Sequence, residues 1–220
     1  HAFLSKGVCH VSYTADEAPS LGYAPYGRIT EAKYGSAERW AKATAQRMRS
    51  WGLNTVGAWS SPEMHRVGLA YAPILDIAAS AGKDVWLRGG VVDVFSPAFI
   101  EGAHTVALAK CGPLKDDPWL LGYFTDNELR WGPDWRSKES LLETFLKMPD
   151  GSPGRKKAEE LLQRRGRTGD PTDEDKAEFL RMVARQYFKV CKEAIRSADP
   201  NHMIIGCRFA GYAPQPVLEG

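Results

Sequence analysis

One short stretch of the sequence, LLGYFTDNELRWG at residues 120–132, places groups capable of acid–base chemistry beside aromatic rings. Its first half is apolar, and its second half brings Asp126, Asn127 and Glu128 one after another. A carboxyl group can protonate a leaving oxygen or take a proton from water, and the faces of Trp and Tyr rings stack on sugar rings. This combination at the end of an apolar strand predicts a site for glycoside cleavage.

Glu128 is the predicted general acid/base of this site. In retaining glycosidases this group protonates the leaving oxygen and later activates water, opposite a second carboxylate that attacks the anomeric carbon. A Glu at a strand end that is partly desolvated by aromatic rings can have its pKa raised toward neutrality. Asn127 is predicted to bind a sugar hydroxyl near the reacting carbon. For Asp126 we favour a structural role, such as capping the next helix.

Aromatic and imidazole side chains near the strand ends are candidates for sugar contact. Trp59 and Trp131 are predicted as platforms on which a sugar ring stacks, with packing in the core as the alternative for each. His65, in the loop SSPEMHR, is a candidate sugar contact. His10 is a candidate lining residue, although a hydrogen-bonded histidine of the core is the favoured interpretation for it.

Arg88 follows the apolar run DVWL and precedes a Gly, so its side chain is expected to reach the mouth of the site. There it would orient Glu128 or a sugar hydroxyl. The alternative is a structural salt bridge with Asp93 or Asp126. Arg88 is therefore included among the substrate-binding candidates.

Apolar segments alternate with segments of helical periodicity along the chain. Strands are expected at residues 7–13, 53–60, 84–95, 118–128 and 202–211. Helices are expected at residues 37–51, 68–82 and 97–111, and after Thr172. Ser36 and Thr172 are the expected N-caps, and residues 17–35 read as a long Gly/Pro/Tyr-rich loop. Trp40 and Trp51 are expected to pack on one face of the first helix.

The strands are continuously apolar, so they are predicted to be buried on both faces of a parallel sheet. A doubly wound sheet and a (β/α)8 barrel both fit this pattern, but no GxGxxG follows the first strand and there is no P-loop. Polar and aromatic residues follow each strand instead, where barrel enzymes build their active sites. These residues are His10, Tyr13, Trp59, Arg88, Asp93, Asp126, Asn127, Glu128 and Arg208. The predicted fold class is therefore α/β, a (β/α)8 TIM barrel.

Residues 1–220 are predicted to be the N-terminal part of a single (β/α)8 catalytic domain, with about five of its βα units. A charged helical insertion is expected at about 137–175. The chain starts with His1, and its last residues, APQPVLEG, read as the start of a helix, so truncation at both ends is expected. Open sheet edges would remain, and the isolated fragment is expected to be inactive.

The composition argues against several classes of partner. The chain has 29 Lys and Arg against 27 Asp and Glu, a balance that predicts neither nucleic acid nor a membrane surface as partner. No apolar run is long enough for a transmembrane helix. The four Cys include no CxxC pair and the five His show no ligand spacing, so no metal and no cofactor are predicted. Cys9, Cys191 and Cys207 are expected to be buried thiols. Nothing in the sequence predicts an oligomeric state.

Two motifs carry a resemblance to a known family. GYFTDNELRWG resembles the fourth-strand motif of clan A glycoside hydrolases, retaining (β/α)8 enzymes in which an Asn-Glu pair carries the acid/base. WGLNTVGAWSS is similar to the second-strand region of the agarase-like members near family 50, with families 42 and 5 more distant. The resemblance implies that Glu128 is the acid/base and that Asn127 binds the 2-hydroxyl. It also implies a nucleophilic Glu at the seventh strand, beyond residue 220; Glu219 lies in an expected helix and does not fit that role.

The resemblance implies a glycosidase that degrades a β-linked, galactose-containing polysaccharide or oligosaccharide of the agarose type. A secreted or periplasmic location is implied in the same way. A non-catalytic carbohydrate-binding barrel is the alternative, and a Glu at the end of the seventh strand would distinguish the enzyme from the binder. An unrelated barrel enzyme, such as a lyase or an aldolase, would need a Lys at a strand end, a metal cluster or a phosphate loop, and the sequence shows none.

Overall fold

The structure, a computed structural model, describes residues 3–14, 17–81, 86–87 and 90–220. The chain divides into two compact units. The first comprises His1–Ile74 and Asp116–Phe124, and the second comprises Leu75–Lys115 and Thr125–Gly220. Each unit is described by itself below.

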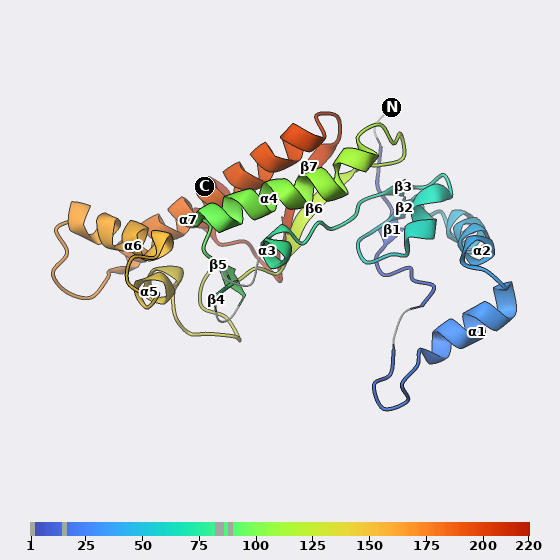
Figure 1. The fold of residues 1–220 in the computed structure, drawn as a ribbon, viewed down its shortest axis with the longest axis horizontal. Helices are drawn as coiled ribbons and strands as arrows, with labels where there is room; N and C mark the ends of the chain where they lie inside the picture. Colours follow the sequence, from blue (N-terminus) through green and yellow to red (C-terminus); the bar gives the residue numbers. More distant parts are fainter. Residues whose placement is uncertain (1–2, 15–16, 82–85, 88–89) are drawn as a thin grey trace. The chain divides into compact units, whose positions relative to one another are not determined.

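The first unit contains a small parallel sheet (Figure 1). Its strands, in spatial order, are β1 (Gly7–Val8), β2 (Thr55–Val56) and β3 (Ala70–Tyr71). Gly7 pairs with Thr55, and Val56 pairs with Tyr71. Further parallel bridges join Tyr71 to Leu120 and Ile74 to Phe124. The predicted parallel pairing is thus confirmed in this unit.

Helix α2 (Ala37–Ser50) begins where the sequence predicts, because the Ser36 hydroxyl accepts a hydrogen bond from the Arg39 N–H at 3.2 Å. Trp40 is buried on this helix as expected. Trp51 is 69% exposed, so the prediction that it packs is wrong: it lies just past the last residue of the helix.

Two local predictions in this part of the chain are wrong. Residues 17–35 contain helix α1 (Pro25–Tyr34): Pro25 starts the helix and Gly35 ends it with a left-handed φ of 72°, so these residues delimit a helix and not a loop. Of the segment predicted as a helix at 68–82, residues 68–81 are described, and they form β3 and a short helix, α3 (Ile77–Ser80). Pro73 prevents a helix from running through this apolar segment. The short 3-10 helix η1 (Pro62–Arg66) follows β2.

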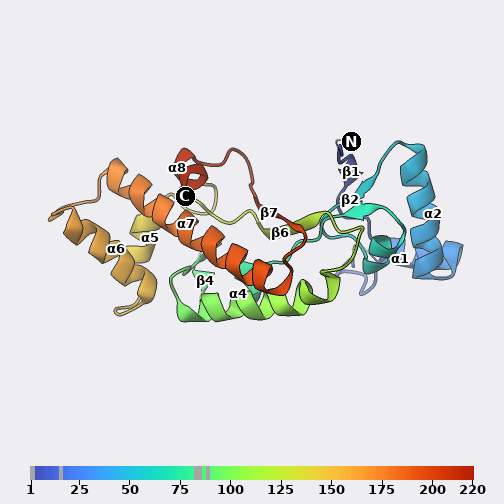
Figure 2. The same ribbon diagram turned by 90° about the horizontal axis from the view of Figure 1, so that it is seen from above.

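The second unit is mainly helical. Among its described residues, the helices are α3, α4 (Pro97–Lys110), η3 (Gly112–Leu114), α5 (Leu141–Leu146), α6 (Pro153–Arg164), α7 (Asp173–Ala198) and α8 (Gln215–Glu219). Helix α7 packs along α4, and both views show the two side by side (Figures 1 and 2). Strand β7 (Met203–Arg208) is hydrogen-bonded to β6 (Gly122–Asn127). These two strands deliver the residues of the candidate site.

Helix α7 confirms two predictions. Thr172 caps it, in a reciprocal arrangement with Asp175. The predicted buried face is also present, consisting of Phe179, Val183, Tyr187, Val190 and Ala194. Helices α5 and α6 lie within residues 137–175, where a charged helical insertion is predicted. No described helix is both long and apolar enough to cross a membrane.

The segment predicted as a strand and exit loop at 84–95 instead contains β4 (Trp86–Leu87) and β5 (Val91–Val92), which pair antiparallel. The prediction of one strand followed by an exit loop is therefore wrong here, because an antiparallel pair needs two strands of opposite direction. Burial of every strand on both faces is also not observed: β1 is exposed, and Met203 and Ile205 of β7 are 52% and 38% exposed.

Three of the four cysteines are buried thiols, namely Cys111, Cys191 and Cys207. Burial raises the pKa of the Cys207 thiol to about 12. Cys9 is exposed, so the prediction of a buried thiol is wrong at that position. It follows directly on β1, which is itself exposed.

Candidate functional site

Asp126, near the end of β6, supports the site from inside the second unit. Its side chain is 2% exposed and accepts hydrogen bonds from the Ala78 N–H at 3.0 and 3.1 Å and from the Tyr187 hydroxyl at 2.6 Å. Burial raises the pKa of Asp126 to about 7, although these hydrogen bonds oppose the shift. The predicted structural role is confirmed, but the helix whose start Asp126 caps is α3, which precedes it in the sequence and is not the next helix.

Arg208, the last residue of β7, holds the two residues that follow this buried acid. Its guanidinium Nη1 donates to the Asn127 side-chain Oδ1 at 3.1 Å. Its main-chain carbonyl accepts the Glu128 N–H at 2.8 Å. Asn127 is half-buried and Glu128 is exposed. The predicted enclosure of the Glu128 carboxylate by aromatic rings is therefore absent from the part of the second unit that the structure describes.

The backbone of Glu128 is in the left-handed region, with φ 53°. Non-glycine residues rarely adopt this conformation because the side chain then approaches the following carbonyl. Among the described residues only three other non-glycine residues share it: His10 (φ 61°), Trp59 (φ 57°) and Asp76 (φ 52°). Strained backbone conformations cluster at functional sites. Two of these three, His10 and Trp59, are also predicted site residues.

A second arginine, Arg136, contacts Glu128 from the loop that follows it. The Arg136 Nη1 donates to the Glu128 main-chain carbonyl at 2.7 Å. The Asp134 Oδ2 accepts from the Arg136 Nε at 2.8 Å and from its Nη2 at 2.7 Å. The guanidinium lies over the Trp135 ring, 4.5 Å from its centroid. Sequence reasoning missed this group; its only signal is an Asp and an Arg on either side of a Trp.

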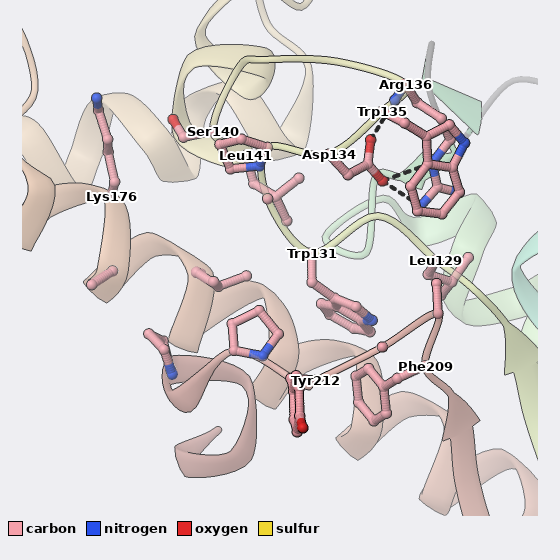
Figure 3. Close-up of a pocket in the computed structure, with 18 residues that line it drawn as sticks. Leu129, Trp131, Asp134, Trp135, Arg136, Ser140, Leu141, Lys176, Phe209 and Tyr212 are labelled. Carbon is pink, nitrogen blue, oxygen red and sulfur yellow. Dashed lines mark hydrogen bonds and ion pairs between the residues drawn. The ribbon is translucent and has the colours of Figure 1, made fainter.

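A cavity of about 440 Å³ adjoins this loop. Trp135 and Tyr212, which are 68% and fully exposed, line it together with Phe209 and Lys176 (Figure 3). Aromatic walls with a few polar groups are typical of sites for small ligands and sugars. Tyr212 was not among the predicted site residues.

Trp131 lines the same cavity but is only 7% exposed. Its ring stacks on Phe188 with 5.8 Å between centroids and meets Tyr187 edge-on at 5.5 Å. These contacts directly support the packing alternative. Stacking of Trp131 on a sugar ring stays a prediction.

In the first unit, His10 and Trp59 lie close together at the ends of β1 and β2. Their ring centroids are 6.4 Å apart, and the His10 N–H donates to the Ala58 carbonyl at 2.8 Å. His10 is exposed, so the favoured interpretation as a core histidine is wrong: β1 does not extend far enough to bury it. Trp59 is 42% exposed, which leaves part of its ring accessible, as a sugar platform requires.

His65 lies in η1 and stacks on Tyr71, with 4.1 Å between ring centroids and an 8° angle between the planes. Burial lowers the pKa of His65, which favours a neutral imidazole. The Tyr71 hydroxyl donates to the Asp117 carboxylate at 2.8 Å. The predicted sugar contact of His65 remains a prediction, as does the role of Arg88, which lies outside the described residues.

Glu219 lies in α8, as predicted, and forms an ion pair with Arg181. Among the described residues, no group of three or more His, Cys, Asp or Glu side chains could hold a metal ion. The structure thus brings together His10 and Trp59 in the first unit, and Asn127 and Glu128, both held by Arg208, in the second.

Comparisons with known proteins identify agarases as similar to this chain. No family model matches the chain. Beta-agarase B of Vibrio sp. (strain JT0107) is 29% identical over 236 residues, which cover 88% of this chain and 24% of the relative. Beta-agarase A of the same strain is 25% identical over 233 residues, 84% of this chain and 23% of the relative. The chain thus spans about a quarter of the length of these curated relatives.

Solved structures of agarases are similar to the chain. An agarase, AgWH50C, matches with a TM-score of 0.71 and 28% identity, over 89% of this chain and 32% of that structure. An exo-beta-agarase matches with a TM-score of 0.74 and 24% identity, over 90% and 32%. BpGH50 matches with a TM-score of 0.75 and 20% identity, over 93% and 47%. The predicted resemblance is confirmed: the chain is similar to agarase-like glycoside hydrolases of family 50.

Proposed function

We propose that this chain forms part of a retaining glycoside hydrolase of the agarase type, with Glu128 as its general acid/base. One observation carries the proposal: Glu128 leaves β6 with a left-handed backbone that Arg208 and Arg136 hold from two sides. This conformation costs about 1–2 kcal/mol, so it persists only where its surroundings enforce it. The similarity to beta-agarases supports the same reading.

The proposed architecture is a (β/α)8 barrel, of which this chain supplies the N-terminal part. The parallel pairing of β1, β2 and β3 supports it, because barrels are built from parallel strands. Barrel active sites lie at the carboxyl ends of the strands, and Glu128 and Arg208 both occupy such ends. The nucleophile is proposed to be a second Glu at the seventh strand, outside this chain.

In the first step, Glu128 donates its proton to the glycosidic oxygen as that oxygen leaves the anomeric carbon, while the second carboxylate attacks the same carbon. In the second step, the Glu128 carboxylate takes a proton from water, and the water oxygen displaces the enzyme carboxylate. The Arg208 guanidinium already donates to the side-chain Oδ1 of Asn127, so the side-chain NH2 group of Asn127 would donate to the sugar 2-hydroxyl.

The proposed substrate is a β-linked, galactose-containing chain. The cavity of about 440 Å³ beside the Glu128 loop presents Trp135 and Tyr212, whose exposed faces suit the apolar faces of sugar rings. In the first unit, Trp59 and His10 are proposed to make further sugar contacts.

Glu128→Gln in the full-length protein tests the proposal. Loss of general acid catalysis is expected to slow cleavage of agarose oligosaccharides by roughly 10²–10⁴-fold. Aryl glycosides with good leaving groups need little protonation, so their first step should slow much less. Azide should restore turnover on these substrates and yield a glycosyl azide, because it attacks the glycosyl-enzyme without needing a base.

Circular dichroism and the thermal midpoint of the variant should match those of the wild type. Near-normal cleavage of oligosaccharides by the variant would remove Glu128 from the acid/base role. A full-length wild-type protein that binds the oligosaccharides without cleaving them would instead establish a non-catalytic carbohydrate-binding barrel.

A further inference from the structure

We propose that Arg136 is a positioning residue for Glu128: its hydrogen bond to the Glu128 main-chain carbonyl fixes the backbone conformation that aims the carboxylate at the glycosidic oxygen. The inference rests on the proposed acid/base role of Glu128. Arg136 touches neither the Glu128 side chain nor a reacting atom in the described contacts, so its effect on the reaction would pass through the peptide group.

The Arg136 guanidinium is held in a single orientation. Nε and Nη2 both donate to Asp134 Oδ2, which leaves Nη1 to donate to Glu128 at 2.7 Å. Asp134 is fixed in turn, because its Oδ1 accepts the Arg136 N–H at 2.7 Å and the Ser137 N–H at 3.3 Å. The side chains of Arg136 and Asp134 are 24% and 18% exposed, so the pair is more sheltered than ordinary surface ion pairs.

The charge state of Asp134 agrees with this geometry. Its partial burial alone would raise the pKa of the carboxyl group. The hydrogen bonds and the charge of Arg136 outweigh that effect and hold the pKa of Asp134 below its usual value. Asp134 therefore remains ionised and keeps its hold on the guanidinium throughout the neutral range.

The backbone at Gly90 makes room for this arrangement. A Cβ atom at Gly90 would lie 2.9 Å from the Arg136 Nη1, and the glycine has a left-handed φ of 79°. The Gly90 carbonyl also accepts the Arg130 N–H at 3.0 Å, which anchors the start of the loop that carries Arg136. The guanidinium thus occupies a space that a larger residue at position 90 would close.

The peptide group after Glu128 affects the position of the carboxylate, because the Glu128 carbonyl and the Glu128 side chain are attached to the same Cα atom. Arg208 fixes the Glu128 N–H, and Arg136 fixes the Glu128 carbonyl, so the two arginine residues together determine φ and ψ. Without Arg136, the carbonyl loses a charge-assisted hydrogen bond and the strained backbone can relax. Misplacement of a catalytic group by about 1 Å can reduce the rate by about 10²-fold.

Arg136→Ala in the full-length protein provides the main test, with Arg155→Ala as a matched control. Arg155 also donates to a main-chain carbonyl, that of Met148 at 2.9 Å, and also pairs with a carboxylate, that of Glu159 at 2.7 Å. Its side chain is 29% exposed, close to that of Arg136, but it does not contact Glu128. It controls for the general loss of one such arginine.

The expected result is a dependence on the leaving group. Arg136→Ala should lower kcat for agarose oligosaccharides about 10²-fold, because the acid is misplaced. Since Arg136 also lines the cavity and lies over the Trp135 ring, any rise in KM should be smaller than this loss of kcat. Aryl glycosides with good leaving groups should lose much less. Arg136→Lys should restore part of kcat, since Lys can donate one hydrogen bond but lacks the planar fork. Arg155→Ala should behave as the wild type on both substrates.

Other outcomes overturn the inference. An equal loss on both kinds of substrate, or a rise in KM alone, would show that Arg136 acts through the fold or binds sugar directly. If Arg136→Ala fails to fold, Asp134→Ala replaces it: this variant keeps the guanidinium but frees it, and it should show the same dependence on the leaving group with a smaller loss. An unchanged kcat in Asp134→Ala would likewise refute the positioning role.

The Glu128→Gln variant, assayed on the same substrates, separates the two proposals. If Glu128→Gln shows the dependence on the leaving group and Arg136→Ala does not, only the positioning role fails. If Glu128→Gln shows no such dependence, the acid/base assignment fails and the positioning role fails with it.

Discussion

The two carboxylates on either side of Asn127 lie in opposite surroundings at the end of β6. Asp126 is 2% exposed, and its oxygens accept hydrogen bonds from Ala78 and Tyr187. Glu128 is exposed, and its neighbours hold its main chain. The strand end is thus fixed through the side chain of one acid and the main chain of the other. This division leaves the second carboxylate available for chemistry.

The largest effect on stability is expected from Asp126→Ala. The substitution leaves the Ala78 N–H buried without this acceptor, and an unsatisfied buried group costs about 1–3 kcal/mol. The Tyr187 hydroxyl keeps a second acceptor, the Thr125 hydroxyl oxygen at 2.8 Å. The free energy of unfolding should fall by roughly 1–3 kcal/mol, as measured by urea denaturation of the full-length protein. Glu128→Ala, on the exposed side, should change it by less than about 0.5 kcal/mol.

Asp126→Asn serves as the control for size, because it retains one acceptor oxygen and nearly the same volume. It should lose less stability than Asp126→Ala at pH 7. Equal stability of Asp126→Ala and Glu128→Ala would erase the contrast between the two acids and contradict the supporting role of Asp126.

A second expected effect is on the pH dependence of stability. The pKa of Asp126 is raised from 3.8 to about 7 in the folded protein, so between these values the folded state binds a proton that the unfolded state has lost. This contribution to stability is complete below about pH 4 and disappears as the pH rises to about 7. Urea denaturation at a series of pH values should show a steeper decline in the wild type than in Asp126→Asn. Identical slopes would mean that Asp126 does not titrate in this range.

The sequence predicts features that depend on neighbouring residues better than features that depend on residues far apart in the chain. Thr172 and Ser36 act as caps because a cap depends on residues within one helical turn. The support from Asp126 could be anticipated because the acid ends an apolar strand. The antiparallel pair β4–β5 and the helix α1 could not be predicted in this way. The Gly and Pro residues in these two segments are equally compatible with a loop, a turn or a helix end.

The contacts of the Glu128 main chain were not predictable for a related reason. Arg208 is far away in the sequence, and its carbonyl reaches Glu128 only because β7 lies beside β6. Arg136 is near in the sequence, but its orientation depends on the Asp134 turn and on the space above Gly90. Composition and periodicity do not encode either condition, so they predict Glu128 as a residue and not its backbone conformation.

The smallest expected effect tests that conformation directly. Glycine adopts φ near 53° without a steric penalty, whereas alanine retains the penalty of about 1–2 kcal/mol. The greater freedom of glycine in the unfolded chain offsets part of this gain. Glu128→Gly should therefore be more stable than Glu128→Ala by up to about 1 kcal/mol, although both lack the carboxylate and should be inactive on oligosaccharides. A lower thermal midpoint for the glycine variant would show that the backbone at 128 is not strained. The hydrogen bonds from Arg208 and Arg136 would then not be needed to maintain the backbone conformation of Glu128.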